Sequence, residues 1–193
     1  MAISTINQAG LTAPLTLTSP VLTTPNLGTP SAINLSNATA LTSAALPAGS
    51  IIQTVYNQPA GVTFTFNTTF QNSGSITITP KFSNSLIAVW YTGLWYPYDG
   101  SPSTNNQVGM VGQLVRGTTA STNYIMGQNY WEIQVSGAQT YTYYGNQTYQ
   151  GVDAPATTSP VTYTLFVSSW ASSTASSYVR TASQSMIAME IKQ

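Results

Sequence analysis

The chain has 193 residues, four Lys or Arg and four Asp or Glu, so its formal net charge is zero and charged residues make up only 4% of it. The scattered Lys81, Arg116, Arg180 and Lys192 form no basic cluster, and no run of about 20 apolar residues is present, which excludes nucleic-acid binding and membrane insertion. The absence of His and Cys excludes Ser–His–Asp and Cys–His catalysis, disulfides and the usual zinc sites, and no cofactor motif is found.

The first quarter of the chain, residues 1–50, differs in composition from the rest. No aromatic residue precedes Tyr56, no charged residue precedes Lys81, and prolines recur every five or six residues from Pro14 to Pro30. Each proline removes a backbone donor and opposes helix, which leaves extended geometry. The sequence therefore predicts an extended N-terminal arm over residues 1–50.

This arm is too poor in large apolar side chains to order itself. Fixing about 50 residues costs roughly 50–100 kcal/mol of backbone entropy, at about 1–2 kcal/mol each. Burying its apolar side chains completely returns only about 20–40 kcal/mol. We therefore predict that the arm becomes ordered against other chains and docks on a larger particle. The residues predicted to dock are Ile3, Ile6, Leu15, Leu17, Val21, Leu22, Leu27, Ile33 and Leu35.

Residues 51–193 show the period-two alternation of half-buried β-strands. VTFTFNTTF, SITITP and MIAMEIK alternate apolar and polar residues, and LIAVWYTGLWY is apolar on both faces, which is typical of a central strand. Turn-forming groups such as NSGS and YDGSPSTNN separate these segments. The predicted strands cover 51–56, 62–66, 75–79, 86–96, 108–116, 124–126, 132–135, 141–144, 161–170 and 186–192. The predicted fold is all-β, an antiparallel sandwich or jelly roll.

With His and Cys absent, carboxylate chemistry is what remains for catalysis, and the chain has four carboxylates. Asp99 in YDGSP and Asp153 in VDAP lie in turn contexts, where Asp usually bonds its own backbone. Glu190 lies two residues before Lys192 on a predicted strand, which favours a surface ion pair. Glu132 in NYWEIQV is flanked by rings and is the one candidate for chemistry. A paired-carboxylate site is not evident, so we predict that the chain is not an enzyme.

Two aromatic clusters are candidates for ligand binding. WYTGLWYPY runs from a strand into a turn, and YTYYGNQTY alternates rings with polar residues. Ring faces next to amide and hydroxyl donors suit glycans, and the candidate residues are Trp95, Tyr96, Tyr98, Tyr141, Tyr143 and Tyr144, with Asn105 and Asn106 as donors. The alternative is that these rings fill the core or a subunit interface, as we expect for Trp90, Trp131 and Trp170.

The phrase LTSPVLTTPNLGTPSAINLSNATAL, residues 17–41, resembles the Thr-Pro and Gly-Thr-Pro-Ser repeats of bacteriophage tail fibres and related virion appendages. GSIIQTV, SITITPKFSNSLIAVWY, LVRGTT and MIAMEI resemble a β module of phage structural proteins. The resemblance implies an intertwined homotrimer on the virion surface, with the arm toward the particle and the β domain projecting.

With about three repeats, the chain is similar to short attachments rather than to long fibres. The resemblance therefore implies a capsid decoration or cement protein that binds the major capsid protein or other virion proteins. The alternative that it leaves open is a short tail fibre or receptor-binding tip that recognises a host surface glycan.

Overall fold

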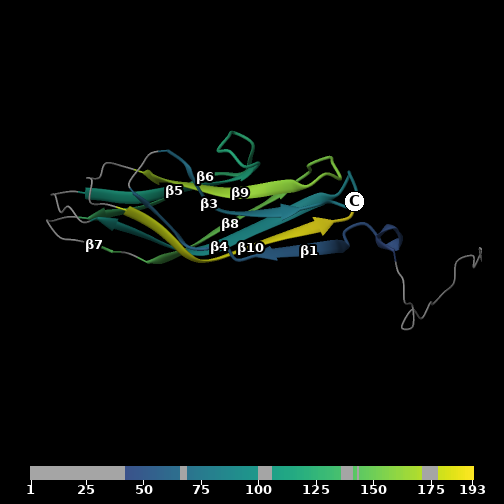
Figure 1. Cartoon of the computed structure of the whole chain (residues 1–193), viewed down its shortest axis with the longest axis horizontal. Helices are drawn as coiled ribbons and strands as arrows, with labels where there is room; N and C mark the ends of the chain where they lie inside the picture. Colours follow the sequence, from purple (N-terminus) through teal and green to yellow (C-terminus); the bar gives the residue numbers. More distant parts are fainter. Residues whose placement is uncertain (1–41, 66–68, 100–105, 136–140, 143, 171–177) are drawn as a thin grey trace, which may run out of the picture. The chain divides into compact units, whose positions relative to one another are not determined.

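The computed structural model describes residues 42–65, 69–99, 106–135, 141–142, 144–170 and 178–193. The predicted docking residues of the arm, from Ile3 to Leu35, and the ring of Tyr143 lie outside these ranges. Figure 1 shows that the described strands form two layers.

The described part of the chain is all-β, as predicted. A single turn of 3₁₀ helix, η2 (Ser43–Ala45), precedes the strands. The strands are β1 (Ile51–Asn57), β2 (Val62–Thr65), β3 (Gln71–Ile78), β4 (Leu86–Asp99), β5 (Asn106–Arg116), β6 (Tyr124–Val135), β7 (Tyr141–Thr142), β8 (Gly145–Asp153), β9 (Val161–Trp170) and β10 (Tyr178–Ile191). Every pairing between them is antiparallel.

Eight of these strands have the pairing order of a jelly roll. One layer contains β1-β10-β4-β8, with the short β2 and β7 at its margins, and the other contains β3-β9-β5-β6. The pairs are nested, because β1 pairs with β10, β3 with β9, β4 with β8 and β5 with β6. The chain is thus one long antiparallel ribbon, rolled so that β10 also meets β4 and β9 also meets β5. This is the jelly-roll form of the predicted sandwich.

The strand predictions were accurate for type and less accurate for length. The two short strands expected at 124–126 and 132–135 are one strand, β6, because its partner β5 continues opposite the intervening residues. The strand expected at 186–192 begins eight residues earlier, at Tyr178. We did not predict β8, whose Asn, Gln and Thr residues resemble a loop. It forms because its pairing with β4 satisfies its backbone groups.

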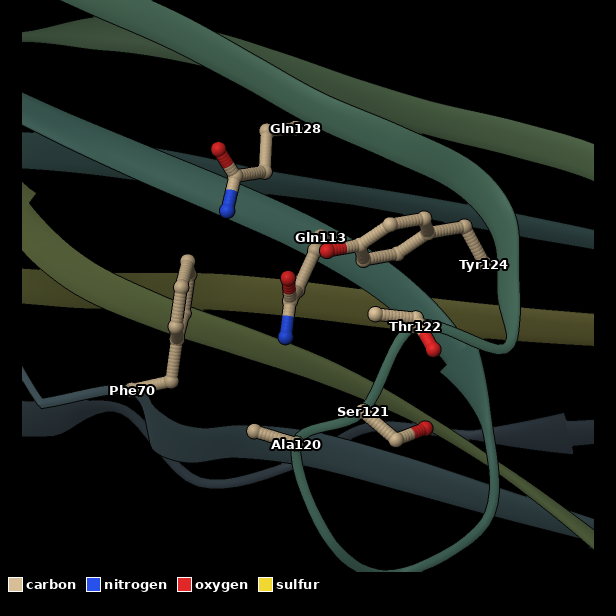
Figure 2. Close-up of a pocket in the computed structure, with 7 residues that line it drawn as sticks. All are labelled: Phe70, Gln113, Ala120, Ser121, Thr122, Tyr124 and Gln128. Atoms are coloured by element: carbon tan, nitrogen blue, oxygen red, sulfur yellow. The ribbon is translucent and has the colours of Figure 1, made fainter.

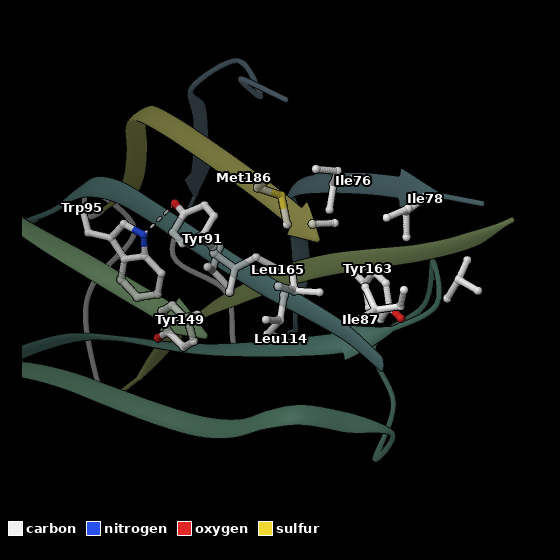
Figure 3. Packing of buried hydrophobic residues seen from close by; sticks show 14 of the residues in the cluster. Ile76, Ile78, Ile87, Tyr91, Trp95, Leu114, Tyr149, Tyr163, Leu165 and Met186 are labelled. Carbon is white, nitrogen blue, oxygen red and sulfur yellow. Dashed lines mark hydrogen bonds between the residues drawn. The ribbon is translucent and has the colours of Figure 1, made fainter. Parts of the chain in front are cut away.

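The core lies between the two layers and follows the alternation of the strands. On β4, the inward-facing Ile87, Val89, Tyr91 and Trp95 are completely buried. They pack against the inward side chains of β5, β8, β9 and β10, which include Met110, Leu114, Tyr149, Tyr163, Leu165, Met186 and Ala188 (Figure 3).

Candidate functional site

The last part of the predicted arm, residues 42–50, contains a 3₁₀ turn and is bonded to the end of β10 of the same chain, and we call it the arm root. The backbone N–H of Gly49 donates to Lys192 O at 2.7 Å, and the backbone N–H of Lys192 donates to Ser50 O at 2.9 Å. The Lys192 ammonium donates to Ala44 O at 2.6 Å and to Leu46 O. Figure 1 shows the root beside the C-terminus, at one end of the two layers. The point where the arm leaves the β domain is therefore fixed by the last strand.

Glu190 does not pair with Lys192, so the predicted surface ion pair is wrong. Its side chain is completely buried, and it faces the core on the same side of β10 as Met186 and Ala188. It accepts hydrogen bonds from Gln53 Nε2 at 2.6 Å, Ser85 Oγ at 2.8 Å, and the backbone N–H groups of Lys81 and Phe82 at 2.8 and 3.1 Å. The alternation of MIAMEIK put Glu190 on the same side of the strand as Met186 and Ala188, but it did not indicate that this side faces the core, and the nearby lysine suggested exposure.

These hydrogen bonds keep Glu190 ionised although its donors are all uncharged. Burial by itself raises the pKa of the carboxyl, but the donors from Ser85, Gln53, Phe82 and Lys81 outweigh it, and the pKa lies below its ordinary value. The carboxylate ties together β1, the turn before β4, and β10. Its role here is structural.

The outer side of the β1-β10-β4-β8 layer carries apolar side chains in adjacent cross-strand rows. One row aligns Tyr56, Ile187 and Trp90, and the next aligns Met189, Ala88 and Val152. Tyr56 and Val152 are 56% and 59% exposed, and Ile187, Met189 and Trp90 are half-buried. A hollow of about 370 Å³ lies beside Trp90 and is lined by Gln150, Gly151 and Val152. We call the two rows the outer apolar face.

Trp95, predicted as a glycan contact, belongs to the core instead, which was the alternative. It is completely buried and stacks on Tyr149, with ring centroids 5.4 Å apart. Its indole N–H donates to Tyr91 Oη at 3.1 Å, and Tyr91 Oη donates to Gln184 Oε1 at 2.8 Å. Figure 3 shows this arrangement. The ring therefore has no face available to a sugar.

Of the other glycan candidates, the structure brings Tyr96 and Tyr144 together. Their ring centroids lie 5.1 Å apart, and the Arg180 guanidinium carbon lies 5.1 Å from the centroid of Tyr96. Tyr96 is only 7% exposed, whereas Tyr144 is 61% exposed. Tyr98 is half-buried on β4. Tyr141 and Asn106 lie within strands, but their side chains, like the whole of Asn105, lie outside the described part of the chain.

Of the three tryptophans expected to fill the core, Trp90 lies instead on the outer side of its layer, and Trp131 packs partly buried against the core. The side chain of Trp170 lies outside the described part of the chain.

Of the remaining carboxylates, Asp99 is the last residue of β4, and its side chain lies outside the described part of the chain. Asp153 ends β8 and accepts from Arg116 at 3.3 Å and from Tyr163 Oη at 3.0 Å, which links it to both layers. Glu132 is exposed on β6. Among the described residues, no group of three or more acidic side chains could hold a metal ion. No helix within these residues is long and apolar enough to cross a membrane.

A small pocket that sequence reasoning missed lies on the outer side of the other layer. Its volume is about 210 Å³, and its walls come from the segment before β3, from β5, from the β5–β6 loop and from β6. The lining residues are Phe70, Gln113, Ala120, Ser121, Thr122, Tyr124 and Gln128 (Figure 2). A lone glutamine in an apolar strand, as in VGMVGQLVR, was the one signal that could have indicated it.

No protein-family model matches the sequence, and no curated protein matches it. Among solved structures, the chain is similar to the VP2 protein of infectious bursal disease virus in T=1 particles, with a TM-score of 0.34, 13% identity and coverage of 90% of this chain and 44% of that one. The VP2 subviral particle gives a TM-score of 0.32, 12% identity, and coverage of 72% and 32%. A chain of the T13 particle of the same virus gives a TM-score of 0.29 and 11% identity, with coverage of 72% of this chain and 35% of that one. The chain spans less than half the length of these proteins, and likenesses this weak carry no argument about function.

Proposed function

We propose that the chain is a non-enzymatic bacteriophage structural protein, a homotrimeric capsid decoration protein that docks through its N-terminal arm and stabilises the particle. The observation that carries this proposal is the arm root. Because Lys192 holds Ala44, Leu46, Gly49 and Ser50 against the end of β10, a force on the arm passes directly into the folded domain. Such a fixed exit suits a docking segment better than a free linker.

Docking of this kind would stabilise the particle by mass action. The arm has the composition of a segment that becomes ordered on binding, and the major capsid protein or another virion protein is the proposed partner. An arm that orders only on assembled subunits lowers the free energy of the assembled state relative to the dissociated one. The jelly roll is used by viral capsid proteins and by lectins, so the fold agrees with this role without selecting it.

The outer apolar face supports the proposed trimer. The exposed Tyr56 and Val152 and the half-buried residues between them form one continuous apolar surface, which indicates an interaction surface rather than ordinary scattered exposure. The two rows contain no charged residue, so a second copy of the chain could cover them without burying an unpaired charge.

The docking proposal is tested by deleting residues 1–41 and measuring cosedimentation with particles of the phage that encodes the chain. The arm root is kept, because Lys192 bonds it to the domain. We expect the truncated protein to remain folded and to lose particle binding. A truncated protein that decorates particles as fully as the whole chain would refute the proposal. Copy number per particle then separates a head location, with hundreds of copies, from a tail location.

The trimer is tested with two matched substitutions on β8. Val152→Asp places a charge on the outer apolar face, whereas Thr148→Asp places the same charge on the same side of the strand, in a row where Thr148 is paired with Thr92. We expect Val152→Asp to lower the mass measured by analytical ultracentrifugation from trimer to monomer, and Thr148→Asp to leave it unchanged. A monomeric parent chain, or equal masses for both variants, would contradict the proposal.

The second candidate function is a receptor-binding tip that recognises a host surface glycan. The observation that favours it is Tyr144, which is 61% exposed and rests against Tyr96, the ring that also faces Arg180. Glycan-array binding by the whole chain, lost in Tyr144→Ala and in Tyr98→Ala, would support this function. Trp95→Ala is not a useful variant, because it would remove a core side chain.

A further inference from the structure

The pocket in Figure 2 is built on a loop that the sheet holds in place. Gly117, at φ 126°, turns the chain out of β5, and its backbone N–H donates to Thr162 O at 2.8 Å. Thr164 Oγ1 donates to Gly117 O at 2.6 Å, and Arg116 N–H donates to Asn123 O at 3.2 Å. The two ends of the loop that lines the pocket are therefore held in place, Gly117 by β9 and Asn123 by the end of β5.

Gln113 forms the floor of this pocket and carries a carbonyl without a donor. The residue is 2% exposed, and its Oε1 accepts no hydrogen bond from any described residue. A buried amide oxygen in this state destabilises the fold, because it has lost its water and gained no partner. An apolar residue would suit this position better, as Val111 and Val115 do two residues away on the same side of β5. The stability of the fold therefore does not explain why this position carries an amide.

Two aromatic rings stand on either side of Gln113. Figure 2 shows Phe70 on one side, with a ring face toward the amide, and Tyr124 on the other. Tyr124 is 43% exposed, so one side of the pocket opens to solvent. At the rim, Gln128 Oε1 accepts from Tyr130 Oη at 2.6 Å, and the Gln128 amide nitrogen points toward the pocket. The pocket thus combines ring faces, one buried acceptor and a rim donor.

This chemistry selects a small neutral ligand rich in hydroxyl groups. None of the described residues that line the pocket is charged, so an ionic ligand would find no counter-charge among them. The volume of about 210 Å³ lies below the range of roughly 300–1,000 Å³ that is usual for drug-sized ligands, so the pocket accommodates one ring. A pyranose offers apolar C–H faces for the rings of Phe70 and Tyr124 and hydroxyl donors for an unpaired oxygen.

We propose that this pocket binds one neutral saccharide ring, with a sugar hydroxyl donating to Gln113 Oε1 and the ring seated between Phe70 and Tyr124. The site is separate from the glycan residues considered above and lies on the other layer of the jelly roll. The site is formed without the arm and without a second copy of the chain. The saccharide proposal can therefore be correct even if the docking or trimer proposal is wrong.

The test uses the whole chain and a panel of methyl glycosides of glucose, galactose, mannose and N-acetylglucosamine. Saturation-transfer NMR detects binding, and isothermal titration calorimetry measures affinity. We expect at least one glycoside to bind, and Gln113→Leu and Tyr124→Ala each to weaken it tenfold or more. Ile51→Ala, which removes an exposed apolar side chain from the opposite layer, is the control and should leave the affinity unchanged.

Thermal unfolding separates a binding role for Gln113 from a structural one. We expect the Tm of Gln113→Leu to equal or exceed that of the parent chain, because the substitution removes an unsatisfied buried group. Absence of saturation transfer to every glycoside, equal affinity in Gln113→Leu, or a marked fall in its Tm would each overturn the proposal. Saturation transfer to a neutral tetrapeptide but to no glycoside would overturn it as well.

Discussion

Glu190 shows at the residue scale how a carboxylate is kept in a core without a cation. Four uncharged donors surround it, two from side chains and two from the backbone around Lys81 and Phe82. Hydrogen bonds to an ionised acceptor are roughly twice as strong as neutral ones, which offsets the loss of hydration. Because Glu190 is stabilised by these uncharged donors, Lys192 is available to donate to the arm root.

We predict that Glu190→Gln lowers the free energy of unfolding at pH 7 by about 1.5–3 kcal/mol, because an amide presents N–H groups to donors that need an acceptor. The pKa of Glu190 is lowered on folding, so its contribution is present above the ordinary value of 4.5 and is lost as the pH falls through the folded pKa. Urea unfolding at pH 7 and pH 3 measures both effects. The difference between the parent and Glu190→Gln should shrink at pH 3, and a constant difference would contradict this account.

Three buried tyrosines predict a loss of stability in alkali. Burial raises the pKa of Tyr91 to about 12, and burial also raises the pKa values of Tyr149 and Tyr163. Because the unfolded chain ionises near pH 10 while the folded one does not, the stabilisation is complete below pH 10 and declines above it. Thermal melts between pH 8 and 11.5 should show a Tm that falls above pH 10, with a smaller slope for Tyr149→Phe.

At the scale of elements, the close contact of the two layers depends on a glycine in β5. A Cβ on Gly112 would meet Tyr149 Oη and would lie 2.6 Å from Trp95 Cη2. The stacked rings of β4 and β8 therefore rest directly on the backbone of β5. This contact explains why an apolar strand, predicted correctly from 108–116, carries a residue of low strand propensity at its centre.

We predict that Gly112→Ala lowers the free energy of unfolding by about 1–3 kcal/mol, because the buried rings have to move to admit the methyl group. Gly127→Ala in the neighbouring β6 is the control, since a Cβ there meets no atom within 4 Å. It should change stability by no more than about 0.5 kcal/mol. Equal effects of the two substitutions in urea unfolding would show that the layers are not in tight contact at Gly112.

For the whole molecule, the position at which the arm ends has a measurable consequence. A chain that begins at Thr42 keeps every hydrogen bond between the root and Lys192, whereas one that begins at Ile51 loses those to Ala44, Leu46, Gly49 and Ser50. We predict that the Tm of the first truncation equals that of the β domain in the whole chain, and that the second unfolds several degrees lower. Differential scanning calorimetry measures the Tm of both truncated chains. Equal Tm values would mean that the arm root does not contribute to the stability of the β domain.

Period-two alternation after residue 50 was enough to predict an all-β fold, because it distinguishes the two faces of each strand. The composition also determined that His- and Cys-based chemistry is impossible. The pairing of β1 with β10, the burial of Trp95 and Glu190, and the position of Gln113 at the floor of a pocket became known from the folded chain. The physical reason is that alternation is local, whereas a jelly roll is closed by pairs that lie far apart in the chain. A side chain's partners, and therefore its use, depend on which distant strand is opposite.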